Sequence, residues 1–193
     1  MRIIAGKKRG MKLLAPKAGP TRPITDRVKE SLFNVLSNYG LPRGCIVADL
    51  FCGVGSLGLE ALSRDAECVT FVEKDPGVAA VLAKNIAKAG FGDRSTVIVA
   101  SVFSIGAPLR DKQRHDLVFV DPPYAETAET GVGSTLDKLL AIVSQQITTD
   151  AVVVVRTQRK TRLVNRYGRL GVLERREWGT MAVTLLSMIR DDG

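Results

Sequence analysis

A short apolar stretch followed by a glycine-rich loop is the feature that most limits how this chain can fold. Residues 45–51 form a mostly apolar predicted strand, and Gly53, Gly55 and Gly58 follow in a G-x-G-x-x-G arrangement. Strand, loop and helix in this order open a doubly wound α/β sheet, with a ligand site at the carboxyl end of the strand. Glu73 ends the next predicted strand, where a carboxylate can accept hydrogen bonds from ribose hydroxyls. The stretch therefore predicts a site for a nucleoside-type cofactor.

Strands and helices alternate through the rest of the chain, as is typical of parallel βαβ units. The expected strands are 69–73, 95–100, 116–120 and 151–155, and the expected helices are 56–64, 76–89 and 136–146. An antiparallel pair, 172–178 and 181–189, is expected at the end of the chain, and a helix capped by Thr25 is expected before the sheet. The predicted fold class is α/β.

The first twenty residues carry a different pattern. Residues 2–5 and 11–14 resemble two short strands around a basic turn, 6–10, that has a glycine at each end. A lone hairpin is marginally stable in water, so this one must dock or bind a partner. The chain is therefore divided into an N-terminal basic β-hairpin extension, residues 1–20, and a main domain, residues 21–193.

Charge is distributed unevenly, although the net value is +8. Residues 1–43 hold ten Lys and Arg against two acidic residues, and residues 156–176 hold eight against Glu174 alone. The stretch between them is net acidic. Two basic flanks indicate a polyanionic partner. Alternatively, these residues form a solvated basic face that only aids solubility.

The residue near the end of the first strand separates two kinds of cofactor. Asp49 places a carboxylate beside the glycine loop, where it would repel a pyrophosphate approaching the helix N-terminus. The same carboxylate would attract a cation such as the ammonium group of S-adenosylmethionine (SAM), and the glycines would leave room for its methionyl part. The sequence therefore favours SAM over NAD, with a structural turn acid as the alternative for Asp49.

A second motif, Asp121-Pro122-Pro123-Tyr124, follows the predicted strand 116–120 at the edge where open α/β sheets bind ligands. The prolines fix the backbone and remove two N–H donors, which leaves carbonyl groups as acceptors. Asp121 and the Pro122 carbonyl would accept the hydrogens of an exocyclic amine while its nitrogen attacks a methyl group. Tyr124 would stack on the planar base that carries the amine. The alternative is a rigid turn with a satisfied acid.

Several classes of function are disfavoured by what the sequence lacks. His115 is the only histidine, so neither a metal site nor a Ser-His-Asp mechanism is expected. The three cysteines show no C-x-x-C spacing and are expected as free, buried thiols in a reducing compartment. Purely apolar runs such as 151–155 are far too short to span a membrane, and no signal peptide is recognised. A soluble, cytoplasmic protein is expected.

Together these segments resemble the RsmD family, SAM-dependent methyltransferases that act on N2 of a guanine in 16S ribosomal RNA. The glycine loop and Asp-Pro-Pro-Tyr are shared with many amino-methyltransferases, including those that modify adenine N6 in DNA. The N-terminal stretches are the more specific part. The matching stretches are 2–6, 9–10, 21–23, 26–28, 33–34, 49–64, 72–73, 119–124 and 178–180.

The resemblance implies a Rossmann-like class I SAM-methyltransferase fold, a seven-stranded, mostly parallel sheet with an antiparallel last strand, plus the N-terminal β-hairpin extension. It implies 16S rRNA as the partner, within the small ribosomal subunit or its precursor, and a monomer without a membrane or a metal. The expected cofactor contacts are Asp49, Phe51, Gly53, Gly55, Glu73, Ser101 and Val102. The expected catalytic contacts to the flipped guanine are Asp121, Pro122 and Tyr124. The expected RNA contacts are Lys7, Lys8, Arg9, Lys12 and Arg22, with Arg22 and Thr25 near the mouth of the active site.

The chain departs from the family at two positions. After the third strand the family often has Asp or Asn facing the adenine amino group, whereas this chain has Ser101, followed by Val102, whose backbone can share the contact. After the fifth strand the family often has Glu, whereas this chain has Arg156.

Three alternative functions remain compatible with parts of the sequence. An adenine-N6 methyltransferase would use the same Asp-Pro-Pro-Tyr motif, so only the N-terminal residues argue against it. An NAD-type oxidoreductase is supported by the glycine loop alone and disfavoured by Asp49. A non-catalytic RNA-binding module would leave Asp121 and the cofactor loop unexplained.

Overall fold

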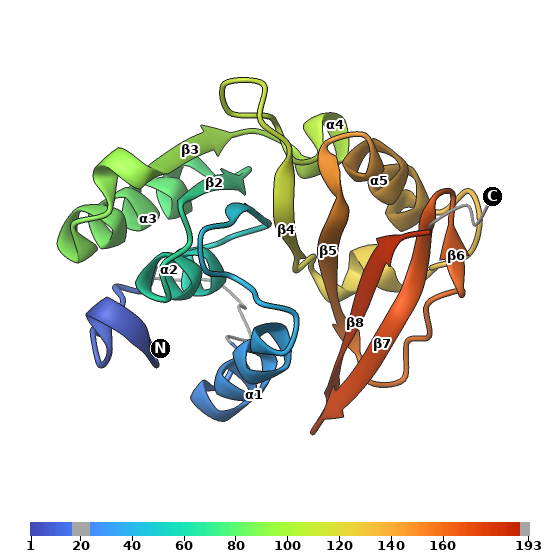
Figure 1. The fold of residues 1–193 in the computed structure, drawn as a ribbon, viewed down its shortest axis with the longest axis horizontal. Helices are drawn as coiled ribbons and strands as arrows, with labels where there is room; N and C mark the ends of the chain where they lie inside the picture. The colour runs from blue at the N-terminus through green and yellow to red at the C-terminus, as the bar shows by residue number, and fades with distance from the viewer. Residues whose placement is uncertain (17–23, 190–193) are drawn as a thin grey trace.

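The computed structural model describes residues 1–16 and 24–189, and these residues form one eight-stranded sheet (Figure 1). The strand order is β3-β2-β1-β4-β5-β8-β7-β6. Strands β1 to β5 run parallel, whereas β8 is antiparallel to both β5 and β7. The bounds are β1 Ile46–Leu50, β2 Cys68–Glu73, β3 Ser95–Val99, β4 His115–Val120, β5 Ile147–Gln158, β6 Arg166–Tyr167, β7 Leu170–Trp178 and β8 Met181–Met188.

This topology confirms the expected Rossmann-like methyltransferase fold with a reversed last strand. The expected strand number is wrong, because the described residues hold eight strands rather than seven. The additional strand, β6, has two residues and joins the edge of the sheet by pairing Arg166 and Tyr167 with β7. A segment this short cannot show the period-two alternation by which strands are recognised.

Helices cover both faces of the sheet (Figure 1). Alternation along β4 shows the division, because Leu117 and Phe119 pack with α1, α2 and α3, whereas Val118 and Val120 pack with α4 and α5. The helices are α1 Asp26–Ser37, α2 Ser56–Ser63, α3 Pro76–Ala89, α4 Val102–Ile105 and α5 Thr135–Ser144, with short 3-10 turns η1 Gly6–Lys8, η2 Gly92–Arg94 and η3 Tyr124–Thr127. The expected cap of α1 is present, since Thr25 Oγ1 accepts the Val28 N–H.

The N-terminal segment, residues 1–16, is less regular than the expected hairpin. One bridge joins Arg2 to Lys12, and the turn between them contains η1. The N–H groups of Ile4 and Ala5 instead donate to the Glu60 carboxylate of α2, at 2.7 and 3.0 Å. A longer strand ladder does not form because these donors are used by a side chain of another element.

Glu60 is buried and also forms ion pairs with two basic side chains. Lys29 Nζ of α1 lies 3.3 Å from one of its oxygens, and Arg64 Nε lies 2.8 Å from the other. Burial lowers the pKa of Lys29, and the charge of Glu60 opposes that shift. The N-terminal segment, α1 and α2 are therefore held together by one fully buried ion pair.

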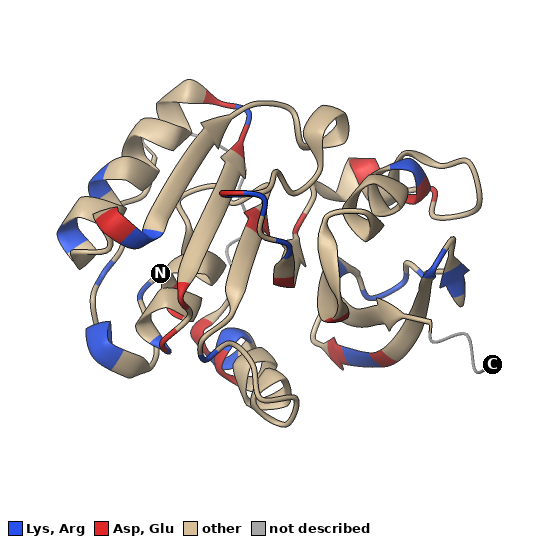
Figure 2. Ribbon diagram, turned by 45° about the horizontal axis from the view of Figure 1, so that its top comes forward, with Lys and Arg blue, Asp and Glu red and all other residues tan. Residues whose placement is uncertain are grey.

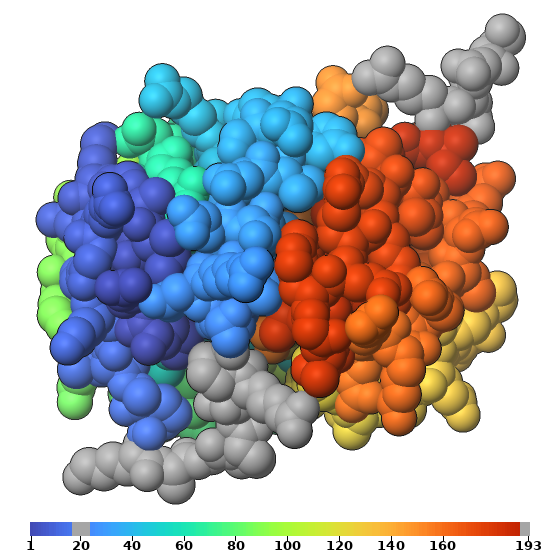
Figure 3. Space-filling model, turned by 90° about the horizontal axis from the view of Figure 1, so that it is seen from below, coloured from blue at the N-terminus to red at the C-terminus, as the bar shows by residue number. Residues whose placement is uncertain are grey.

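The two ends of the described chain lie at different ends of the molecule. Figure 3 shows the N-terminal segment at one side of this face, α1 in the middle, and the β7–β8 hairpin at the other side. Tyr39, just after α1, donates to Glu174 of β7 at 2.9 Å, which joins α1 to the hairpin. The predicted domain boundary between residues 20 and 21 and the predicted contact Arg22 lie outside the described residues. Among the described helices, none is both long enough and apolar enough to cross a membrane.

Candidate active site

Two predicted cofactor carboxylates lie at the carboxyl ends of β1 and β2. Asp49 is buried, and its Oδ2 accepts the Gly58 N–H of α2 at 2.8 Å. The Glu73 carboxylate accepts the N–H groups of Gly53 at 3.0 Å and Asp75 at 2.9 Å. Both acids therefore fix the backbone of the loops that surround the expected cofactor site.

The three glycines of the loop have different roles. A Cβ atom on Gly58 would lie 2.3 Å from the Phe71 ring, and one on Gly55 would lie 2.4 Å from Leu82, so both glycines permit close packing. Gly53 has a φ of +54°, and no described heavy atom lies within 4 Å of the position its Cβ would take. Gly53 is thus where a ligand can approach the backbone of this loop.

A second loop comes close to the end of β1. Phe51 has a positive φ of 57°, which is uncommon for a residue with a side chain, and its ring lies 5.2 Å from that of Phe103. Phe103 follows Val102, the first residue of α4, which is buried. Ser101 is exposed, and its hydroxyl caps no N–H group of this helix. The predicted contacts therefore lie close together, with Phe51 in the loop after β1 and Ser101 and Val102 at the start of α4.

Asp121 directly follows β4 and makes an ion pair that the sequence does not reveal. Its Oδ1 lies 2.5 Å from Nε of Arg156, and the two side chains are 19% and 13% exposed. Val120 pairs with Val155 across β4 and β5, so the next residue of each strand lies at the same level. Burial raises the pKa of Asp121, and the Arg156 guanidinium opposes this shift.

The rest of the Asp-Pro-Pro-Tyr motif is held by its backbone. The Asp121 N–H donates to Leu50 O of β1 at 3.4 Å, which joins the motif to the end of β1. Pro122 is buried, and Tyr124 begins the turn η3, where its carbonyl accepts the Thr127 hydroxyl. The structure thus brings Asp121, Pro122 and Tyr124 to the sheet edge that carries Asp49 and Glu73.

Carboxylates dominate the electrostatics of this edge. Burial raises the pKa of Asp49 well above its usual range, the Gly58 N–H opposes the shift, and the charges of Asp121 and Glu73 add to it. Such repulsion makes the edge unfavourable for a pyrophosphate and favourable for a cationic ligand or an amine. The described residues contain no group of three or more His, Cys, Asp or Glu that could hold a metal ion.

The predicted RNA contacts of the N-terminal turn lie elsewhere. Lys7 Nζ makes an ion pair of 2.7 Å with Asp65, and the Lys8 N–H donates to Ser63 at the carboxyl end of α2. That end of α2 leads to the start of β2, whereas Asp121 follows the end of β4. The turn 6–9 therefore lies at the amino ends of the parallel strands, whereas Asp121 lies at their carboxyl ends. Lys12, whose carbonyl accepts a hydrogen bond from Lys88, is not brought to Asp121 either.

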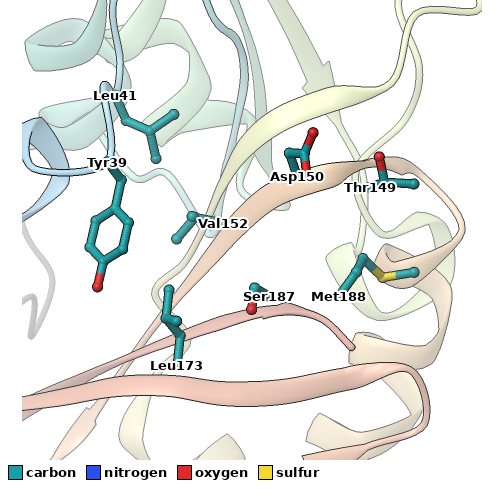
Figure 4. A pocket seen from close by; sticks show the side chains of 8 residues that line it. All are labelled: Tyr39, Leu41, Thr149, Asp150, Val152, Leu173, Ser187 and Met188. Atoms are coloured by element: carbon teal, nitrogen blue, oxygen red, sulfur yellow. The ribbon is translucent and has the colours of Figure 1, made fainter. Parts of the chain in front are cut away.

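A groove of about 480 Å³ lies away from both motifs (Figure 4). It lies beside the start of β5, so it is at the other end of that strand from Arg156. The lining residues are Tyr39, Leu41, Thr149, Asp150, Val152, Leu173, Ser187 and Met188. No predicted site residue is among them, so we do not assign the groove to the cofactor or the base.

The strand order, the reversed β8 and the two motifs at the carboxyl edge define a class I methyltransferase fold. A solved structure of a putative methyltransferase from Escherichia coli (yhhF) agrees, with a TM-score of 0.80, 32% identity and 97% of each chain covered. A putative methylase from Haemophilus influenzae gives a TM-score of 0.72 and 31% identity over 98% of each chain. The family described as Conserved hypothetical protein 95 matches residues 1–187, and the chain belongs to this family, the RsmD family.

Two curated relatives show how far the likeness extends. Ribosomal RNA small subunit methyltransferase D of E. coli K12 is 43% identical over 124 residues, or 64% of this chain. This match spans 60% of the length of the E. coli protein. A putative rRNA methyltransferase of Bacillus subtilis, YlbH, is 30% identical over 186 residues, which cover 96% of this chain and 97% of that one.

Proposed function

We propose that this protein transfers a methyl group from SAM to the exocyclic N2 amine of a guanine in 16S ribosomal RNA. The observation that carries the proposal is that Asp121 and its proline motif adjoin a glycine loop bordered by Asp49 and Glu73. Relatives in E. coli and H. influenzae are named ribosomal RNA small subunit methyltransferase D, which supports the choice of substrate.

The loop residues fit the proposed cofactor. SAM would supply an electrophilic methyl group on a sulfonium centre. Gly53 offers open backbone for the methionyl part, and Glu73 has the position from which a carboxylate accepts ribose hydroxyls. The acids at this edge suit a cofactor that carries an ammonium and a sulfonium. Asp49, Phe51, Gly55, Ser101 and Val102 complete the proposed contacts.

Asp121 would orient the amine for attack. Arg156 Nε is bonded to Oδ1, so Oδ2 is the oxygen of this carboxylate offered to an amine hydrogen. The Pro122 carbonyl would accept the second hydrogen, which aligns the nitrogen lone pair with the methyl group. As the nitrogen–methyl bond formed and the sulfur–methyl bond of the sulfonium broke to leave a neutral thioether, positive charge would develop on the nitrogen. The ionised Asp121 would stabilise that charge and could take the released proton. The ring of Tyr124 would stack on the guanine and hold its plane.

The proposal is tested by incubation with labelled SAM and either small ribosomal subunits or free 16S rRNA from a strain that lacks this enzyme. Nucleoside analysis is expected to show label in N2-methylguanosine, with Asp121→Ala as the inactive control. Label in N6-methyladenosine would establish the adenine alternative instead. Failure to bind SAM in a calorimetric titration, together with binding of NAD, would overturn the proposed chemistry.

A further inference from the structure

A second basic segment, which the proposed function does not use, leaves the sheet beside Asp121. We name residues 159–169, between β5 and β7, the basic connector. Figure 2 shows Lys and Arg along this connector, apart from those of the N-terminal turn. Its exposed basic residues are Arg159, Lys160, Arg162, Arg166 and Arg169.

The path of β5 places the connector at the catalytic edge. Arg156 is bonded to Asp121, and β5 continues only to Gln158 before the connector begins. At about 3.3 Å per residue of extended strand, Arg159 starts about 10 Å beyond Arg156. The Arg159 N–H donates to Thr180 O in the turn of the β7–β8 hairpin, so the start of the connector is fixed.

Hydrogen bonds also fasten the connector to the segment that follows the Asp-Pro-Pro-Tyr motif. Thr130 Oγ1 donates to Arg162 O at 2.6 Å, and the Tyr167 hydroxyl donates to Thr130 O at 2.6 Å. Tyr167 is buried, and its hydroxyl also accepts the Val164 N–H. The connector and the chain around residue 130 therefore form one surface beside the proposed base site.

The surface carries excess positive charge. The Glu177 carboxylate is shared by three cations, Arg159, Arg162 and Arg175. One carboxylate neutralises only one of them. Within residues 1–16 and 24–189, Lys160 and Arg169 have no ion-pair partner. Guanidinium groups bind phosphate oxygens through paired N–H donors, and an exposed set of this kind suits the backbone of a nucleic acid.

We propose that the basic connector binds the RNA phosphates next to the nucleotide whose base reaches Asp121, an inference that rests on the proposed function. A base extruded to the carboxyl edge of β4 keeps its flanking phosphates outside that edge, where the connector lies. The N-terminal turn, at the opposite sheet edge, cannot reach the same phosphates and would bind a more distant part of a large substrate.

The test removes three connector charges in the variant Arg159→Gln/Lys160→Gln/Arg162→Gln. Binding to a short fluorescent RNA hairpin is measured at several salt concentrations. Loss of three phosphate contacts should reduce the slope of log K against log salt by about 2–3, because each contact contributes about 0.7 in a single strand and about 0.9 in a duplex. The KM for small subunits should rise, whereas SAM affinity should stay the same.

A matched control removes the same charge away from the catalytic edge, in the exposed residues Arg43, Lys84 and Lys112. This triple Gln variant should retain the wild-type slope. A second variant, Lys160→Glu/Arg169→Glu, breaks no side-chain ion pair or hydrogen bond of the described residues and should weaken RNA binding more strongly than its single substitutions.

The outcomes separate this inference from the proposed function. If the wild-type protein labels small subunits but both connector variants keep its slope and KM, the connector serves only solubility and the inference is wrong. If control and connector variants lose equal slope, binding is a general effect of net charge and the inference is also wrong. If the wild-type protein labels no RNA, the proposed function itself fails.

Discussion

Two halves of the proposed catalytic edge are constructed differently. On the cofactor side, at the ends of β1 and β2, Asp49 and Glu73 accept hydrogen bonds from backbone N–H groups that lie within 20 residues of them. On the base side, Asp121 is paired with a side chain 35 residues away, Arg156. The cofactor side is thus a local backbone structure, whereas the base side depends on two strands meeting in register.

This difference predicts which substitutions should alter stability and which should alter the reaction. A change in the glycine loop alters the packing of α2 on the sheet, so it should affect stability and cofactor binding together. A change at Asp121 or Arg156 removes one member of a mostly buried ion pair but leaves the pairing of the strands intact, so it should affect chemistry more than the packing of α2. The following substitutions test that contrast.

The largest effect is expected for Asp121→Ala. Loss of one transition-state hydrogen bond should lower the rate of methyl transfer by about 10²-fold or more. Binding of SAM and RNA should remain close to that of the wild-type protein, as measured by calorimetry and gel shift. The control Asp93→Ala removes an exposed acid from η2 and should keep full activity. Near-normal turnover of Asp121→Ala would remove this residue from the mechanism.

A comparison of two glycines should give the next largest effect. Gly58→Ala places a methyl group against Phe71 and should destabilise the fold by about 1–3 kcal/mol, the usual cost of overpacking. Gly53→Ala meets no described atom, so its cost should be limited to backbone strain of about 1–2 kcal/mol, while SAM affinity falls because the approach is blocked. Denaturant unfolding and calorimetry measure the two effects. Equal SAM affinities for wild type and Gly53→Ala would contradict the assignment of the open backbone to the cofactor.

Arg156 should change how methyl transfer depends on pH. Burial raises the pKa of Asp121 and Arg156 opposes it, while Asp49 on β1 is a neighbouring like charge. In the proposed mechanism ionised Asp121 is the active form, so the acidic limb of the rate profile should move to higher pH in Arg156→Gln. Arg156→Lys should restore part of the wild-type profile, because it keeps the charge. A profile that is unchanged in the Gln variant would show that Arg156 does not influence the ionisation of Asp121.

The smallest effect on the rate of methyl transfer is expected for the basic residues of the N-terminal segment, at the amino ends of the strands. Removing Lys7, Lys8, Arg9 and Lys12 should leave the maximal rate unchanged and flatten the salt slope for small-subunit binding by about 2–3, if they contact about three phosphates. Binding assays on purified subunits at several salt concentrations measure this slope. An unchanged slope would assign the four residues to solubility.

The same contrast explains what the sequence could predict. The helix 76–89 is marked by Asp75 and Pro76 at its start and Gly90 at its end, and the structure has these bounds. The glycine loop and the proline motif are also continuous in sequence, so their positions after β1 and β4 follow from local patterns. These parts required no knowledge of tertiary contacts.

The parts that could not be predicted depend on distant residues. The Asp121–Arg156 pair exists because β4 and β5 align, and the only sequence signal is that each residue directly follows an apolar run. The N-terminal strands are shortened because Glu60 takes their donors, and no pattern in residues 1–16 reveals that acid. The four-residue helix α4 is too short to show a helical period.

The buried Glu60 has a consequence for the order in which the chain assembles. Its backbone partners, Ile4 and Ala5, lie 56 and 55 residues earlier in the sequence, so they have no docking site until α2 exists. Such long-range contacts are formed late, because a long loop must close before they contribute. A truncation that removed residues 1–5 would leave a carboxylate in the interior without two of its donors, at a cost of about 1–3 kcal/mol for each unmet hydrogen bond. Residues 4 and 5 are therefore expected to dock late in folding, and the buried Glu60 makes the stability of the sheet domain depend on them.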